Sequence, residues 1–83
     1  MKRSESAMAR RVGDELVILH VNSSRYFGLN DVGAFIWDRL EHDTTRTDLI
    51  DAVVAEYDVD RQQASLDIDD LVQQLVDRRL VEE

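Results

Sequence analysis

The first third of the chain has the apolar patterns of β-strands. Three stretches of this kind span residues 8–12, 15–21 and 25–29. Turn-forming residues separate them, at Gly13-Asp14 and at residues 22–24. In the third stretch, alternation places Phe27 and Leu29 on one face and Tyr26 on the other. Because the connections are short, the three stretches predict an antiparallel meander.

The remaining two thirds have the apolar period of three helices. Their apolar stripes are Val32, Ile36 and Leu40, then Leu49, Ile50, Val53, Val54 and Tyr57, then Ala64, Ile68, Leu71, Val72 and Leu75. Asn30, Thr45 and Asp60 precede the stripes and are residue types that cap helix N-termini. We expect Leu80 and Val81 to close back onto the core. Three strands followed by three helices predict an α+β fold whose helices cover one sheet face.

With 83 residues the chain has room for one small domain. We expect residues 1–7, which are polar and unpatterned, to form a flexible N-terminus, and residues 8–83 to form the domain. The chain has no Cys, which excludes disulfides and thiolate metal sites and fits a cytoplasmic location. No apolar run approaches the length of a membrane span, so we expect no membrane association.

The net charge of −8 limits the choice of partners. Phosphate contacts supply most non-specific affinity for nucleic acids, and an acidic surface repels the phosphates. A nucleic-acid partner is therefore disfavoured unless the cations gather on one face. A basic peptide or protein surface is the better match.

No constellation of catalytic residues is evident. His20 and His42 lie on different predicted elements and have no metal-ligand spacing. Asp67, Asp69 and Asp70 lie on a predicted helix, which separates them, and they lack the Gly and terminal Glu of a calcium loop. We therefore predict a protein that is not an enzyme and that holds no metal or cofactor.

A peptide-binding surface is the candidate site that remains. If the third strand lies at the border of the sheet, its unpaired edge can accept another strand, because it contains no Pro and only Arg25 as a charge. On a helical wheel, Asp67, Asp70, Leu71 and Gln74 fall within one arc that can face such a strand. The candidate residues are Ser24, Arg25, Tyr26, Phe27, Gly28, Leu29, Asp67, Asp70, Leu71, Gln74 and Leu75.

These residues also allow simpler interpretations. Leu71 and Leu75 fit the core, and a core residue can also form the floor of a pocket. Tyr26 fits a packing partner across the outer face of the sheet. The aspartates fit a solvated helix face. The residues alone thus indicate a small acidic module that binds a peptide or a protein.

Several short motifs follow one another along the chain. They are Leu29-Asn30, Ile36-Trp37, Thr45, Tyr57-Asp58-Val59 and Leu80-Val81, and the longest continuous stretch is residues 26–37. Their order and spacing resemble the PqqD-like family, over about residues 8–82. Members of this family are also called RiPP recognition elements because they bind leader peptides of ribosomally made, post-translationally modified peptides.

The resemblance implies a winged helix-turn-helix fold that binds a leader peptide as an added strand, beside the third strand and against the third helix. The run at residues 26–33 is more similar to the stand-alone leader-binding proteins of lasso-peptide biosynthesis than to the protein of pyrroloquinoline quinone biosynthesis. These bind leaders with a Tyr-x-x-Pro motif and deliver them to a leader peptidase, which works with a cyclase. Such a leader would place its Tyr and Pro between Phe27 and Leu71, and its Lys residues near Asp67 and Asp70.

Three alternatives stay open at this point. A winged-helix regulator would read DNA with its third helix, although residues 61–79 carry one net negative charge. A peptide chaperone of pyrroloquinoline quinone biosynthesis would share the fold. An adaptor that docks a radical enzyme or a glycosyltransferase without leader specificity is the third possibility.

Overall fold

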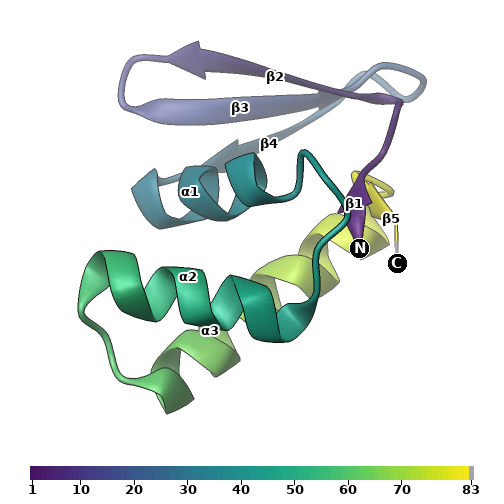
Figure 1. Ribbon diagram of the computed structural model, residues 1–83. Coiled ribbons are helices and arrows are strands. Elements are labelled where there is room, and N and C mark those ends of the chain that lie inside the picture. The colour runs from purple at the N-terminus through teal and green to yellow at the C-terminus, as the bar shows by residue number, and fades with distance from the viewer. Residues whose placement is uncertain (83) are drawn as a thin grey trace.

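The computed structural model describes residues 1–82 and confirms the α+β prediction (Figure 1). A three-stranded antiparallel sheet has the order β2-β3-β4, with strands β2 (Ala7–Val12), β3 (Glu15–His20) and β4 (Arg25–Leu29). The three helices that follow are α1 (Asp31–Arg39), α2 (Arg46–Tyr57) and α3 (Arg61–Asp77). Two short strands, β1 (Lys2–Arg3) and β5 (Val81–Glu82), pair antiparallel with each other. None of the helices in this described part has the length and apolarity that crossing a membrane requires.

The helices cover one face of the sheet. Figure 1 shows α1 directly beneath the sheet, with α2 on its other side and α3 packed against α2. The register of β3 and β4 places Leu16 opposite Leu29 and Ile18 opposite Phe27 on the covered face. Leu16, Ile18 and Leu29 are buried, whereas the opposite face of the sheet stays open. Phe27 and Leu29 therefore share the covered face of the sheet, as the alternation in the sequence predicts.

The core forms between the sheet and the helices as the apolar stripes predict. Its buried members include Ile36, Trp37 and Leu40 of the first helical segment, Leu49, Ile50 and Val53 of α2, and Ala64, Ile68, Val72 and Leu75 of α3. Leu80 and Val81 are also buried, so the expected return of the chain onto the core is confirmed. Leu71 is only half-buried at the edge of this cluster. It is therefore an apolar residue of α3 that remains available to a ligand.

Each helix begins at the predicted cap. The Asn30 side chain accepts a hydrogen bond from the Gly33 amide at 3.0 Å. Thr45 Oγ1 accepts from the Asp48 amide at 3.1 Å, and the Asp60 carboxylate accepts from the Gln63 amide at 3.0 Å. Each cap satisfies an amide that the first turn leaves without a helical partner.

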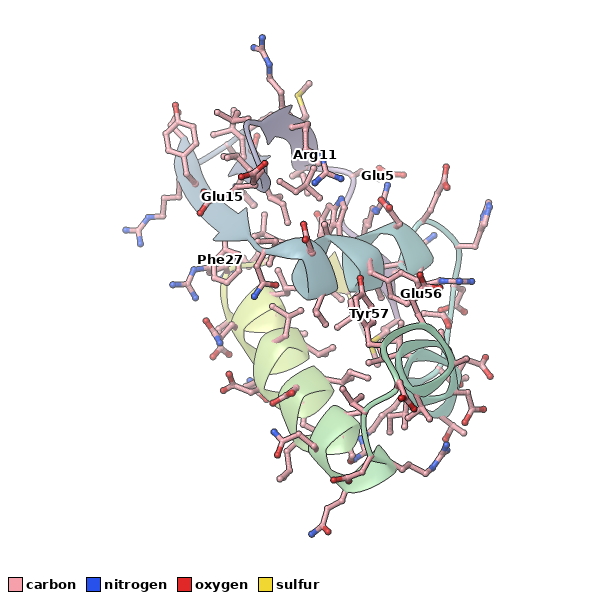
Figure 2. All side chains as sticks on the ribbon, turned by 90° about the vertical axis from the view of Figure 1, so that its left-hand side faces the viewer. Glu5, Arg11, Glu15, Phe27, Glu56 and Tyr57 are labelled. Atoms are coloured by element: carbon pink, nitrogen blue, oxygen red, sulfur yellow. The ribbon has the colours of Figure 1, made fainter. Side chains whose placement is uncertain are left out.

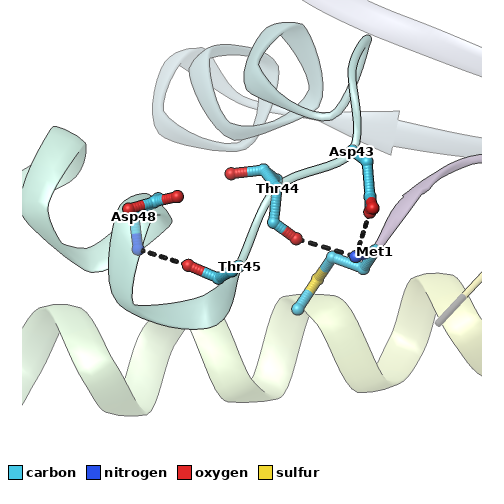
Figure 3. Close-up of polar contacts among 5 residues, drawn as sticks. All are labelled: Met1, Asp43, Thr44, Thr45 and Asp48. Carbon is cyan, nitrogen blue, oxygen red and sulfur yellow. Dashed lines mark hydrogen bonds and ion pairs between the residues drawn. The ribbon is translucent and has the colours of Figure 1, made fainter.

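The chain start, predicted as the flexible segment 1–7, makes specific contacts. The Met1 ammonium donates to Asp43 Oδ1 at 2.8 Å and to the Thr44 carbonyl at 2.7 Å (Figure 3). Its hydrogen bond to Asp43 holds the pKa of that carboxyl below its usual value. The Arg3 guanidinium donates to the Trp37 carbonyl at 2.7 and 2.9 Å. The flexibility of residues 1–7 as a whole stays a prediction, and these contacts argue against it for Met1 to Arg3.

Candidate peptide-binding cleft

Strand β4 is at the border of the sheet. Its one strand partner within residues 1–82 is β3, so its other edge carries backbone groups that no strand of the described chain pairs. Helix α3 runs past this edge, and Figure 2 shows Phe27 between β4 and the C-terminal end of that helix. The Arg78 guanidinium lies over the Phe27 ring, 4.5 Å from its centroid. The edge is therefore exposed beside α3, as the sequence analysis required of a strand-accepting site.

A cleft of about 400 Å³ separates β4 from α3. Its residues come from the end of β4, from the start of α1 and from the middle of α3. They are Phe27, Gly28, Leu29, Asn30, Val32, Gly33, Ile36, Asp67, Asp70, Leu71 and Gln74. Leu29 and Ile36 are buried and form the base, while Asp67 and Asp70 are exposed at the rim. The cleft thus combines an apolar base with an acidic wall.

Two glutamines hold the rim aspartates in place. Gln63 Nε2 donates to Asp67 Oδ1 at 2.9 Å, and Gln74 Nε2 donates to Asp70 Oδ2 at 3.0 Å. Each bond joins residues four apart on α3, a spacing that brings side chains together on one helix face. A carboxylate with one such donor keeps capacity to accept from a cationic side chain. The rim is therefore suited to a Lys or Arg of a ligand.

Asp69 is not part of this cleft. The Arg46 guanidinium of α2 donates to its two carboxylate oxygens, with the Nη2 to Oδ2 distance at 2.8 Å, and also contacts Ser65. The hydrogen bond from Arg46 lowers the pKa of the Asp69 carboxyl and raises that of the guanidinium. This aspartate therefore joins α2 to α3, whereas its neighbours on the chain face the cleft.

Most of the predicted site residues converge on the cleft. Those that line it are Phe27, Gly28, Leu29, Asp67, Asp70, Leu71 and Gln74. Ser24 is in the turn before β4 with a positive φ of 56°, and Arg25 is exposed at the start of the strand. Tyr26 is 72% exposed on the outer face of the sheet, opposite Leu19. Leu75 is fully buried in the core. The structure does not place the side chains of these four residues in the cleft.

The sequence analysis missed the wall that α1 contributes. From the sequence, Asn30 is interpreted only as a cap and Val32 and Ile36 only as a core stripe, and Gly33 has no assigned role, whereas all four line the cleft. A signal was available in Gly33, because a glycine in the first turn of a predicted helix indicates a close approach. A Cβ built on Gly33 would lie 3.0 Å from Leu29 Cδ2. Gly33 thus lets α1 begin directly against the last residue of β4.

The chemistry of the cleft is that of a binding site. Throughout residues 1–82, no three His, Cys, Asp or Glu side chains gather in a way that could hold a metal ion. The cleft also holds no nucleophile paired with a base among its lining residues. What it offers is an unpaired strand edge, an apolar base and oriented carboxylates, which are the features that recognise an extended peptide.

Comparison with known proteins agrees with the fold. A solved structure of TbiB1 in complex with the TbiA(beta) leader peptide is 38% identical, with a TM-score of 0.88 over 99% of this chain and 95% of that one. A lasso peptide synthetase B1 complexed with the leader peptide is 27% identical, with a TM-score of 0.85 over 99% of this chain and 96% of that one. No curated protein matches. The family described as "Coenzyme PQQ synthesis protein D (PqqD)" matches residues 15–81. The chain therefore belongs to the PqqD family, as a PqqD-like RiPP recognition element.

Proposed function

We propose that this protein is a non-catalytic recognition element for the leader region of a ribosomally made precursor peptide. The observation that carries the proposal is the cleft along the free edge of β4, with an apolar base and an acidic wall. Both similar structures are complexes with leader peptides, and one is a lasso peptide synthetase B1. Lasso-peptide biosynthesis is therefore the favoured pathway over that of pyrroloquinoline quinone.

The leader binds by strand addition to β4. The exposed edge supplies backbone amides and carbonyls over residues 24–29, and pairing with them satisfies groups that otherwise contact water. This mode uses the main chain of Ser24, Arg25 and Tyr26, so it does not require their side chains to line the cleft. The added strand would lie between β4 and α3, with alternate side chains directed into the cleft.

Side chains in the cleft select the leader. The leader's Tyr and Pro, from a Tyr-x-x-Pro motif, occupy the apolar space between Phe27 and Leu71. Lys residues of the leader approach Asp67 and Asp70, which their glutamine partners hold on the cleft side of α3. The bound precursor is then delivered to a leader peptidase and a cyclase. Recognition is thus separated from catalysis, in keeping with a cleft that lacks a catalytic constellation.

The charge of α3 disfavours the DNA-binding alternative. Residues 61–77, the observed extent of the helix, hold one Arg and four Asp, so its net charge is −3. Major-groove recognition by this helix would bring the four carboxylates toward a polyanion. The same carboxylates favour a leader with basic residues.

Isothermal titration calorimetry with the cognate leader tests the proposal. We expect a Kd in the low micromolar range or tighter. Asp70→Asn removes a charge from the rim and should weaken binding about threefold to tenfold, since an exposed charged contact contributes a modest free energy. Asp77→Asn is the matched control, because Asp77 also accepts from a glutamine four residues away on α3 but lies outside the cleft. The absence of any heat or competition with the wild-type chain would refute leader recognition.

Backbone methylation of the leader tests strand addition separately. In a strand added at an edge, alternate residues donate their amides to the neighbouring strand. Methylation of the leader nitrogens that donate to β4 should remove most of the affinity. Methylation of the alternate nitrogens, which point away from β4, should leave the affinity unchanged. If the two methylated leaders bound with equal affinity, strand addition would be contradicted and leader recognition would still stand.

A further inference from the structure

Two cations border the end of the cleft that lies opposite its acidic wall. Figure 2 shows Phe27 beside the C-terminal end of α3. Arg78 follows that end of the helix, and its guanidinium lies over the Phe27 ring. Arg25 is two residues before Phe27, so it is on the same face of β4, opposite His20 of β3. We name Arg25 and Arg78 the basic end of the cleft.

Neither cation of the basic end has a carboxylate at ion-pair distance within residues 1–82. Three other arginines in that range form ion pairs, namely Arg3 with Asp38, Arg46 with Asp69 and Arg61 with Asp51. Arg25 and Arg78 are both exposed. A guanidinium over an aromatic ring keeps N–H donors that can hydrogen-bond a carboxylate. Arg78 is therefore held at the Phe27 ring with donors available to a ligand.

The acidic wall and the basic end are spaced to suit an extended peptide. Asp70 is eight residues before Arg78, which at 1.5 Å per residue of helix is a separation of roughly 12 Å. Four residues of an extended peptide span roughly 13 Å, and residues four apart point to the same side of a strand. A strand added to β4 can therefore direct one side chain to Asp70 and another, four residues away, to Arg78.

We propose that Arg78 is a specificity-determining residue, which binds a carboxylate side chain of the leader about four residues from the basic side chain held at Asp70. This inference rests on the proposed function and adds a second, opposite charge to the leader that fits this cleft. Arg25 raises the positive potential at the same end. A peptide with basic residues alone would leave the basic end unpaired, so the cleft selects a leader with both charges in a fixed order.

A purely structural role for Arg78 is the competing explanation, and Arg39 provides the comparison. The Arg39 guanidinium lies over the Phe35 ring, 4.8 Å from its centroid, and Arg39 is also exposed. Both residues of that pair are on α1 and outside the lining of the cleft. The ring beneath Arg78 differs in that Phe27 lines the cleft, so a peptide seated there reaches the guanidinium.

The test is calorimetry of the full chain with the synthetic cognate leader and with leaders in which each Asp or Glu is replaced singly by its amide. We expect Arg78→Gln to weaken binding of the unaltered leader about threefold to tenfold, since the contact is an exposed charge pair. One of the amide leaders should lose the same factor, and Arg78→Gln should weaken that leader by no more than about twofold further. Arg39→Gln is the matched control and should leave the affinity for every leader unchanged.

Charge exchange separates recognition from structure. Arg78→Glu, combined with a leader that carries Lys at the identified position, should regain most of the affinity that either change alone removes. The specificity role would be overturned if Arg78→Gln left the affinity unchanged, if it weakened every leader by the same factor, or if Arg39→Gln caused an equal loss. Leader recognition would still stand in each of these cases. A wild-type chain that binds no leader would refute the proposed function, and this inference with it.

Discussion

At the scale of single residues, Gly33 determines how close α1 can come to β4. Its Gly→Ala variant would place a Cβ 3.0 Å from Leu29 Cδ2 and 3.1 Å from Leu29 Cβ, and Leu29 is buried and cannot move aside. Alanine favours a helix over glycine by about 1 kcal/mol, whereas overpacking costs about 1–3 kcal/mol. The difference predicts a net loss of up to about 2 kcal/mol, and about 1 kcal/mol at the middle of that range, in the free energy of unfolding measured by urea denaturation.

Gly28 provides the control for that measurement. A Cβ on Gly28 would lie 3.4 Å from Glu15 Oε2, which is the end of an exposed, flexible side chain. Gly28→Ala should therefore change the stability by no more than about 0.5 kcal/mol. A Gly33→Ala protein as stable as the wild type would show that the contact with Leu29 relaxes at no cost.

The candidate site was predictable where one element fixes its geometry. Asp67, Asp70, Leu71 and Gln74 share a face because helical spacing alone places them together, and all four line the cleft. The contribution of Gly33 depends on how α1 folds back against β4, which no local pattern records. Leu75 was assigned both to the apolar stripe of this helix and to the candidate site, and its complete burial agrees with the stripe.

At the scale of elements, the caps set where each helix starts. Thr45→Ala removes the acceptor for the Asp48 amide and should lower the free energy of unfolding by about 1 kcal/mol. Thr47→Ala is the control, because Thr47 is exposed and its side chain makes no hydrogen bond within residues 1–82. The difference between the two variants in urea denaturation measures the cap. Equal stability of the two would mean that the amide is satisfied as well by water, and leader affinity should change in neither.

The pairing of β1 with β5 could not be predicted from the sequence, because strands of two residues are too short to show a periodic pattern. What holds β1 is tertiary: the Arg3 amide donates to the Leu40 carbonyl at 3.0 Å, and the Ser4 amide donates to the Leu80 carbonyl at 2.9 Å. The Arg3 guanidinium also lies over the Trp37 ring, 4.9 Å from its centroid. The three helices, by contrast, each carry a cap, and β3 carries a run of β-branched residues, so the starts of these elements could be predicted.

At the scale of the whole molecule, the charges are divided between the two halves of the chain. Residues 30–83 hold fifteen acidic and five basic side chains, and residues 1–29 hold three acidic and five basic ones. Repulsion within the acidic half opposes folding, while attraction to basic residues favours the leader. The acidic side chains therefore lower the stability of the fold and raise the affinity for a basic leader.

Salt should separate these two effects. Raising NaCl from about 0.05 to about 0.5 M shortens the Debye length from roughly 14 to roughly 4 Å, which screens the repulsion among the exposed carboxylates. The free energy of unfolding should rise, because the ion pairs lost to screening, such as Arg61 with Asp51, are exposed and weak. Over the same range the leader affinity should fall. Urea is the denaturant to use, since guanidinium chloride is itself a salt.

Stability that falls with added salt would show that the exposed ion pairs outweigh the repulsion. Leader affinity that is indifferent to salt would show that apolar contacts and backbone pairing, rather than Asp67 and Asp70, hold the peptide.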